Sequence, residues 1–142
     1  MLGRKTFTRE EIDRARDLLS ELTRGYDELA TAVAATADAQ AAAALERVEP
    51  LLGSMLLLAL DRPFVHRIRA VTGKGGTPLN ELELLVDAVS LHGGVLTGNN
   101  VIKYVPEQAV LGLSPGDRVS VTRDDVARLA AGVFSELEEK FV

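Results

Sequence analysis

The residues best placed to do chemistry lie in the stretch VTGKGGTPLNE, Val71 to Glu81, where glycines, a lysine and a threonine precede a predicted helix. A phosphate-binding P-loop has the order GxxxxGK[ST] between a buried strand and a helix, so that its amides and lysine surround the phosphates. Here the order is G-K-G-G-T, and a predicted helix precedes it. The sequence therefore argues against a nucleoside-triphosphatase loop. A milder expectation remains, because free amides of a glycine-rich loop at a helix N-terminus attract anions.

The charge around this loop supports an anion site. Residues 62–80 carry a net charge of +4 and the whole chain carries −5, so the remaining residues carry −9. If residues 62–72 form one helix, Arg62, His66 and Arg69 share a face, because they are spaced four and three residues apart. The predicted site for a small anion, a nucleotide or a phosphorylated metabolite comprises Arg62, His66, Arg69, Lys74, Gly75, Gly76, Thr77 and Asn80. The alternative is that these cations pair with Glu81 or Glu83 and that the glycines only shape a connection between helices.

Catalytic groups are few. His66 is the candidate proton carrier, since the ordinary pKa of histidine is near neutral. Neither His66 nor His92 has a second ligand at metal-motif spacing, and the serines lie in predicted helices, strands or a proline turn instead of a strained nucleophile turn. Cysteine is absent, which excludes disulfides and thiolate sites. We therefore expect no metal and no cofactor, and the sequence favours a protein without catalytic activity.

Length and composition predict one soluble domain. A chain of 142 residues buries roughly two thirds of its unfolded surface, which is enough for a core without staples. The most apolar run, residues 50–60, is shorter than the roughly 20 residues that cross a bilayer, and the N-terminus lacks a secretory signal. We expect a cytoplasmic protein that does not contact membranes. The negative net charge argues against nonspecific binding to nucleic acid.

The N-terminal half predicts two long helices. Thr8 and Glu11 form a capping box. Behind it, apolar residues alternate in steps of three and four, as in a seam against another helix; they are Ile12, Ala15, Leu19, Leu22, Tyr26, Leu29 and Val33. A turn is expected near residues 36–39, and Thr36 or Asp38 could cap the second helix. Pro50 must then kink that helix or begin a new segment.

The C-terminal half predicts shorter elements. A third helix over residues 62–72 ends at Gly73, a fourth begins at Thr77 with Pro78 in its first turn, and a last helix begins at Thr122. Between the last two, the apolar period changes and predicts strands. The predicted fold is mainly α: a single-domain bundle of about five helices over residues 1–142, with residues 1–7 as a flexible N-terminus. A small antiparallel β hairpin pairs about 100–105 with 117–122.

Two stretches resemble known families. The segment IKYVPEQAVLGLSPGDRVSV, residues 102–121, resembles the swapped-hairpin DNA-binding domains of the AbrB and MazE type. That resemblance implies a DNA-binding regulator, but the family's basic residues after the proline are replaced here by EQAV. FVHRIRAVTGKGGTPLNELELL together with NNVIKYVPEQAVLGLSPGDRVSVT resembles a family of small bacterial proteins whose activity is uncharacterised. This second resemblance implies a discrete one-domain protein.

The sequence as a whole favours an interaction or binding protein that forms a homodimer. The heptad seam of the first helix and the apolar run at residues 51–60 support this, since a helix that is apolar all round needs partners on all sides. The alternatives are a protein or small enzyme that binds an anion through residues 62–80, and a DNA-binding regulator.

Overall fold

The computed structural model describes residues 3–142 and is mainly helical. The long helices are α1 (Arg9–Thr36), α2 (Ala39–Asp61), α4 (Pro78–Leu91) and α5 (Arg123–Phe141). The short ones are the α-helix α3 (Arg69–Thr72) and the 3-10 helices η1 (Arg62–Phe64) and η2 (Pro106–Gln108). None of these helices is long and apolar enough to span a bilayer.

The two long N-terminal helices form an antiparallel hairpin with well-defined ends. Thr8 caps α1 through the predicted capping box: its hydroxyl accepts from the Glu11 amide at 3.1 Å, and the Glu11 carboxylate accepts from the Thr8 amide at 2.7 Å. Ala37 takes the left-handed conformation, with φ of 56°, and Asp38 then caps α2. The predicted turn near residues 36–39 is thus confirmed. Pro50 lies inside a continuous α2 on its exposed side, where the carbonyl that loses its partner faces water.

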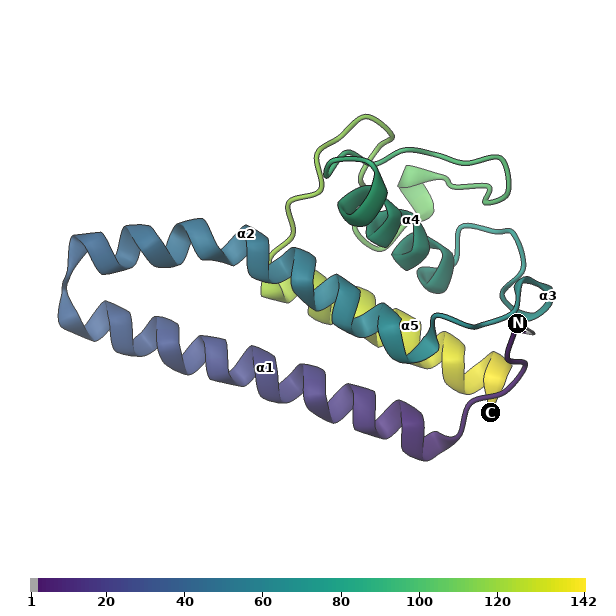
Figure 1. Ribbon diagram of the computed structural model, residues 1–142, viewed down its shortest axis with the longest axis horizontal. Helices are drawn as coiled ribbons and strands as arrows, with labels where there is room; N and C mark the ends of the chain where they lie inside the picture. Colours follow the sequence, from purple (N-terminus) through teal and green to yellow (C-terminus); the bar gives the residue numbers. More distant parts are fainter. Residues whose placement is uncertain (1–2) are drawn as a thin grey trace.

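The core lies where α4 and α5 pack against this hairpin. α5 contacts both α1 and α2, and α4 lies against α2 and α5 (Figure 1). At the C-terminal end of α5, Phe7 packs edge-on to Phe64 at 5.1 Å between ring centroids and contacts Phe141 at 5.3 Å. Residues 1–7 were predicted to be flexible, but Phe7 is buried and its amide donates to the Phe141 carbonyl. Residues 1–2 lie outside the described residues.

The hairpin extends beyond the rest of the molecule (Figure 1). Arg123, at the start of α5, contacts both hairpin helices: its Nε donates to Asp27 at 2.9 Å, its Nη1 lies 3.6 Å from Glu49, and its guanidinium stacks on Tyr26. From there to the turn, residues 28–48 contain no buried side chain. The end of the hairpin is therefore a two-helix projection without a core of its own.

The predicted β hairpin is wrong. Residues 3–142 contain isolated β-bridges but no sheet, and the two predicted strands have different partners. The Lys103 amide donates to the Lys74 carbonyl, whereas the Val119 amide donates to the Gly94 carbonyl. The alternating pattern nevertheless predicted correctly which side chains are buried, since Ile102, Val119 and Val121 all are. The first segment lies against the loop before α4, and the second lies against the loop after α4 and, at Val121, against Gly53 of α2. Each segment therefore buries its apolar side without a neighbouring strand.

Candidate functional site

The predicted helix over residues 62–72 is broken in the middle. After η1 the chain turns at Val65 and His66, passes through an extended Ile68, and resumes helix only at Arg69. The cause is the N-terminal segment: the Arg4 amide donates to the His66 carbonyl at 2.6 Å, and the Ile68 amide donates to the Arg4 carbonyl at 3.0 Å. These bonds replace helical ones, so Arg62, His66 and Arg69 do not share a helical face, and that prediction is wrong.

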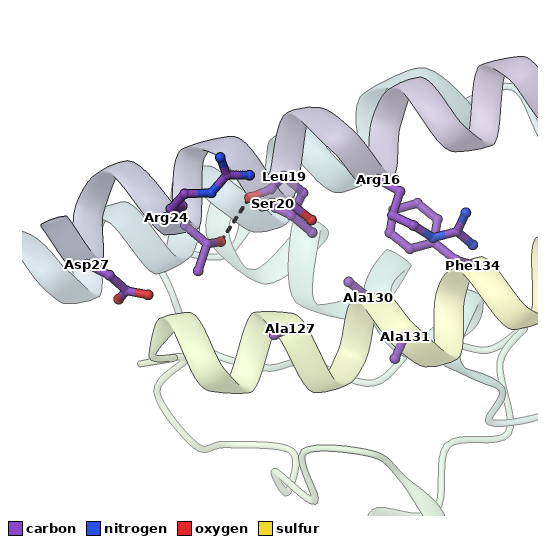
Figure 2. Close-up of a pocket in the computed structure, with 10 residues that line it drawn as sticks. Arg16, Leu19, Ser20, Arg24, Asp27, Ala127, Ala130, Ala131 and Phe134 are labelled. Carbon is purple, nitrogen blue, oxygen red and sulfur yellow. Dashed lines mark hydrogen bonds between the residues drawn. The ribbon is translucent and has the colours of Figure 1, made fainter.

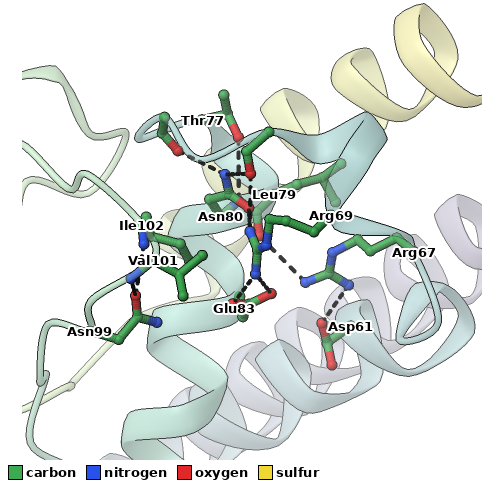
Figure 3. A network of polar contacts seen from close by, with 12 residues as sticks. Asp61, Arg67, Arg69, Thr77, Leu79, Asn80, Glu83, Asn99, Val101 and Ile102 are labelled. Carbon is green, nitrogen blue, oxygen red and sulfur yellow. Dashed lines mark hydrogen bonds and ion pairs between the residues drawn. The ribbon is translucent and has the colours of Figure 1, made fainter. Parts of the chain in front are cut away.

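Arg69 and Asn80 hold the glycine-rich loop against α4 (Figure 3). Arg69 donates to both carboxylate oxygens of Glu83, at 2.8 and 2.6 Å, and to the Asn80 side-chain oxygen at 2.8 Å. The fully buried Asn80 amide donates to the carbonyls of Gly73 at 3.2 Å and Gly75 at 2.7 Å. Arg69 is thus neutralised by a glutamate, as the structural alternative predicted. One turn after Glu83, burial and then the Glu83 charge raise the pKa of Asp87.

The N-terminal amides of α4 already have acceptors inside the protein. Thr77 caps the helix, its hydroxyl accepting from the Asn80 amide, and Pro78 has no amide hydrogen. The Leu79 amide donates to the carboxylate of Glu136 at 2.8 Å. Glu136 is 6% exposed and also accepts from Lys140. Glu136 therefore occupies the place where an external anion would bind at this helix end.

The remaining predicted site residues lie around the loop without forming a polar cluster. Arg62, His66 and Lys74 are exposed, and within residues 3–142 their side chains make no hydrogen bond or ion pair. The glycines allow a close backbone approach: a Cβ atom on Gly76 would lie 3.3 Å from the Lys103 carbonyl oxygen. Of the eight residues, the structure joins Arg69, Gly75, Thr77 and Asn80 in one network. Anion binding by the others stays a prediction.

The second arginine of this region is also paired internally. Arg67 donates to Asp61 at 2.8 Å, and the two side chains are 5% and 12% exposed. It also donates to the carbonyls of Phe64 and Leu79, which ties the end of α2 to the start of α4. The Arg67 Nε is buried without an acceptor within the described chain. This guanidinium therefore stabilises the fold and is not available to a ligand.

Glu81, which the sequence suggested as a partner of the nearby cations, is instead buried and forms no ion pair among the described residues. It is 1% exposed, and its two carboxylate oxygens accept from the amides of Val110 at 2.8 Å and Leu111 at 2.9 Å. It thereby fastens the loop after η2 onto α4. The hydroxyl of Tyr104, which precedes η2, donates to the Leu113 carbonyl of this loop, and burial raises the pKa of Tyr104 to about 12. The sequence did contain a signal for the burial of Glu81, because it lies on the side of the helix that also carries Leu82 and Leu85.

A groove of about 440 Å³ lies between α1 and α5 (Figure 2). Its floor is apolar, with Leu19, Phe134 and three alanines of α5, and its rim carries Arg16, Arg24 and Asp27. The rim groups are mostly used already: Arg16 pairs with Asp13 and Glu138 and stacks on Phe134, and Asp27 pairs with Arg123. The Thr23 hydroxyl donates to the Leu19 carbonyl. The groove therefore presents little polar chemistry to a ligand.

The most distinctive surface of the molecule is apolar and lies on the hairpin. Of the eleven exposed large apolar side chains among residues 3–142, six lie on the two hairpin helices. We call this surface the outer face; it consists of Leu18, Leu22, Leu29, Val48, Leu51 and Met55, which are 44–67% exposed. A shallow depression lined by Leu18, Leu22, Ala59 and Pro63 connects α1 with α2 across it.

The heptad seam of α1 is divided between the core and this outer face. Ile12, Leu19 and Tyr26, spaced seven residues apart, are buried. On the other line of the seam, Ala15 is partly buried against the core, but Leu22 is 44% exposed and Leu29 51%. Half of the seam predicted from the sequence thus packs inside the subunit, and half faces outward.

The described residues contain no group of three or more side chains that could hold a metal ion. Comparison of the chain with protein-family models, with curated proteins and with solved structures finds no match.

Proposed function

We propose that this protein is an interaction protein that acts as a homodimer, and that two copies meet through their outer faces. The observation that carries the proposal is the clustering of six large, half-exposed apolar side chains on two adjacent helices. Such contiguous apolar surface is rare on monomeric soluble proteins and is typical of interaction sites. Two helices packed side by side also present ridges and grooves, and a second pair of helices can pack into them.

The size of the outer face supports a second copy as its occupant. From Leu18 to the turn the hairpin is about 30 Å long, and two helices side by side are about 20 Å wide. The flat area is roughly 600 Å² per copy, against the roughly 500 Å² per partner that a specific interface needs. A hairpin packed on a hairpin would make a four-helix bundle, in which the outward half of the seam becomes core.

The projecting end of the hairpin gives a second reason. Residues 28–48 form well-capped helices although none of their side chains is buried. Isolated helices of this length are marginal in water, because most helix stability in proteins comes from tertiary packing. Pairing with a second hairpin would supply that packing.

Substitution of Leu22 by glutamate tests the proposal. A charge in the middle of the outer face should convert a wild-type dimer into a monomer at micromolar concentration in light scattering, while circular dichroism shows unchanged helix content. Leu91→Glu is the matched control, because Leu91 is 71% exposed at the end of α4 and outside the outer face. A wild-type protein that is monomeric under these conditions would exclude the homodimer.

A further inference from the structure

We infer, on the basis of the proposed homodimer, how the two copies pair: α1 of one subunit lies along α2 of the other about a twofold axis parallel to the hairpin. In this arrangement Glu28 of each copy lies beside Arg47 of the second copy. Two features support this pairing: the positions of the outer-face residues along the hairpin axis, and the charges at the two edges of the hairpin.

The turn determines which residues of the two helices are level. Residues equally far from Ala37 and Asp38 lie side by side, which makes Leu22 level with Gly53 and Glu28 level with Arg47. The cross-hairpin contacts agree with this register, since Arg123 reaches both Asp27 and Glu49. Leu22 is thus level with the interval between Leu51 and Met55, two of the three exposed large apolar residues of α2.

Two twofold arrangements can place one outer face on another. With the axis parallel to the helices, α1 of one copy covers α2 of the other at the same level, in antiparallel contact. With the axis perpendicular to the helices, α1 covers α1 and α2 covers α2. Both arrangements bury the outer face, so the apolar side chains alone do not choose between them.

The edges of the outer face carry different charges. On α1, Glu21 and Glu28 lie three residues after Leu18 and Gly25, so they flank the exposed leucines on the side away from the core. Arg14, four residues before Leu18, lies on the same side nearer the start of the helix, so this edge is acidic only toward the turn. On α2, Arg47 lies four residues before Leu51 and flanks it in the same way.

These edge residues have no ion-pair partner among the described residues of their own subunit. Glu21, Glu28 and Arg47 are all exposed and none of them takes part in an intramolecular salt bridge. The parallel axis places the acidic edge of α1 beside Arg47 of the second copy, twice by symmetry. The perpendicular axis, where it crosses the hairpin at the level of Glu28 and Arg47, places glutamate beside glutamate and arginine beside arginine, which is repulsive. The charges therefore favour the pairing of α1 with α2.

Disulfide trapping distinguishes the two arrangements, and it is simple because the chain has no cysteine. A disulfide needs Cα atoms about 4.4–6.8 Å apart. With α1 against α2, an equimolar mixture of the Leu22→Cys and Met55→Cys variants should form the mixed disulfide under mild oxidation. Leu22→Cys alone should not form a disulfide, because in this arrangement the two copies of residue 22 lie diagonally opposite each other in the four-helix bundle. Rapid crosslinking of Leu22→Cys with itself would overturn the inference.

Charge reversal provides a second, independent measurement. Glu28→Arg and Arg47→Glu should each weaken the dimer about ten-fold in sedimentation equilibrium, because two ion pairs become two like-charged pairs. The double variant, Glu28→Arg with Arg47→Glu, should recover wild-type affinity. If the wild type is a dimer but the double variant is as weak as the single ones, the pairing is wrong while the proposed homodimer stands. If the wild type is a monomer, the proposed function itself fails.

Discussion

Removal of the Glu81 carboxylate should destabilise the protein strongly, although the side chain touches no ligand. Glu81 is 1% exposed and accepts from two backbone amides, those of Val110 and Leu111. Glu81→Ala leaves both amides without their acceptor. Hydrogen bonds to a charged group contribute about 1.5–3 kcal/mol each, so we expect a loss of roughly 3–6 kcal/mol in the free energy of unfolding. That is a large part of the 5–15 kcal/mol that stabilises a typical domain.

The conservative variant refines this expectation. Glu81→Gln keeps one carbonyl oxygen but turns an NH2 group toward the second amide, so it should lose roughly half as much. Glu107→Ala is the control, because Glu107 is an exposed carboxylate in the same part of the chain, and its removal should change stability by less than about 0.5 kcal/mol.

Urea unfolding followed by circular dichroism measures these differences, and the melting temperature of Glu81→Ala should fall by roughly 10–20 °C. Hydrogen exchange adds a local test, since the amides of Val110 and Leu111 should exchange faster in Glu81→Ala before global unfolding. A loss of less than about 1 kcal/mol with unchanged exchange at these two amides would refute the role assigned to Glu81.

Further predictions concern two glycines and one exposed ion pair. A Cβ atom on Gly53 would lie 2.1 Å from the backbone oxygen of Val121, whereas one on Gly25 meets nothing within 4 Å. In thermal unfolding, Gly53→Ala should therefore be destabilised by more than about 2 kcal/mol. Gly25→Ala should be stabilised by up to about 1 kcal/mol. Hydrogen bonding to Arg4 lowers the pKa of Glu11 from 4.5 to about 2. The stability this pair contributes is present above pH 4.5 and is lost as the pH falls toward 2, so Arg4→Gln should flatten the decline of stability in that window.

The local signals that predicted helix ends were strong, and the structure confirms them. Thr8 with Glu11 and Thr122 with Asp125 form reciprocal capping boxes, and Thr77 caps a helix whose first residue is Pro78. These signals succeed because a cap and its amide lie within four residues of each other. The chain therefore encodes them without reference to the rest of the fold.

The signals that failed depend on contacts between distant parts of the chain. Residues 62–72 have a helical pattern, but Arg4 binds the backbone of His66 and Ile68 and interrupts the helix. Residues 100–105 and 117–122 alternate as strands do, but the first segment packs against the loop before α4 and the second against the loop after α4 and against α2. Glu81 was expected to pair with nearby cations, and its actual partners were not predicted, because the two amides lie about thirty residues away along the chain.

Charge that is segregated along the sequence is not segregated in space. The net +4 of residues 62–80 predicted a cationic site, yet Asp61 neutralises Arg67, Glu83 neutralises Arg69, and Glu136 takes the helix end. Carboxylates from neighbouring segments thus bind the cations and the helix N-terminus that were expected to bind an external anion. Arg62, His66 and Lys74 have no internal partner among the described residues but do not form a cluster, whereas the hairpin carries exposed apolar side chains on two adjacent helices. Because unmatched apolar surface is what drives association, the hairpin, and not the glycine-rich loop, is where a partner is best sought.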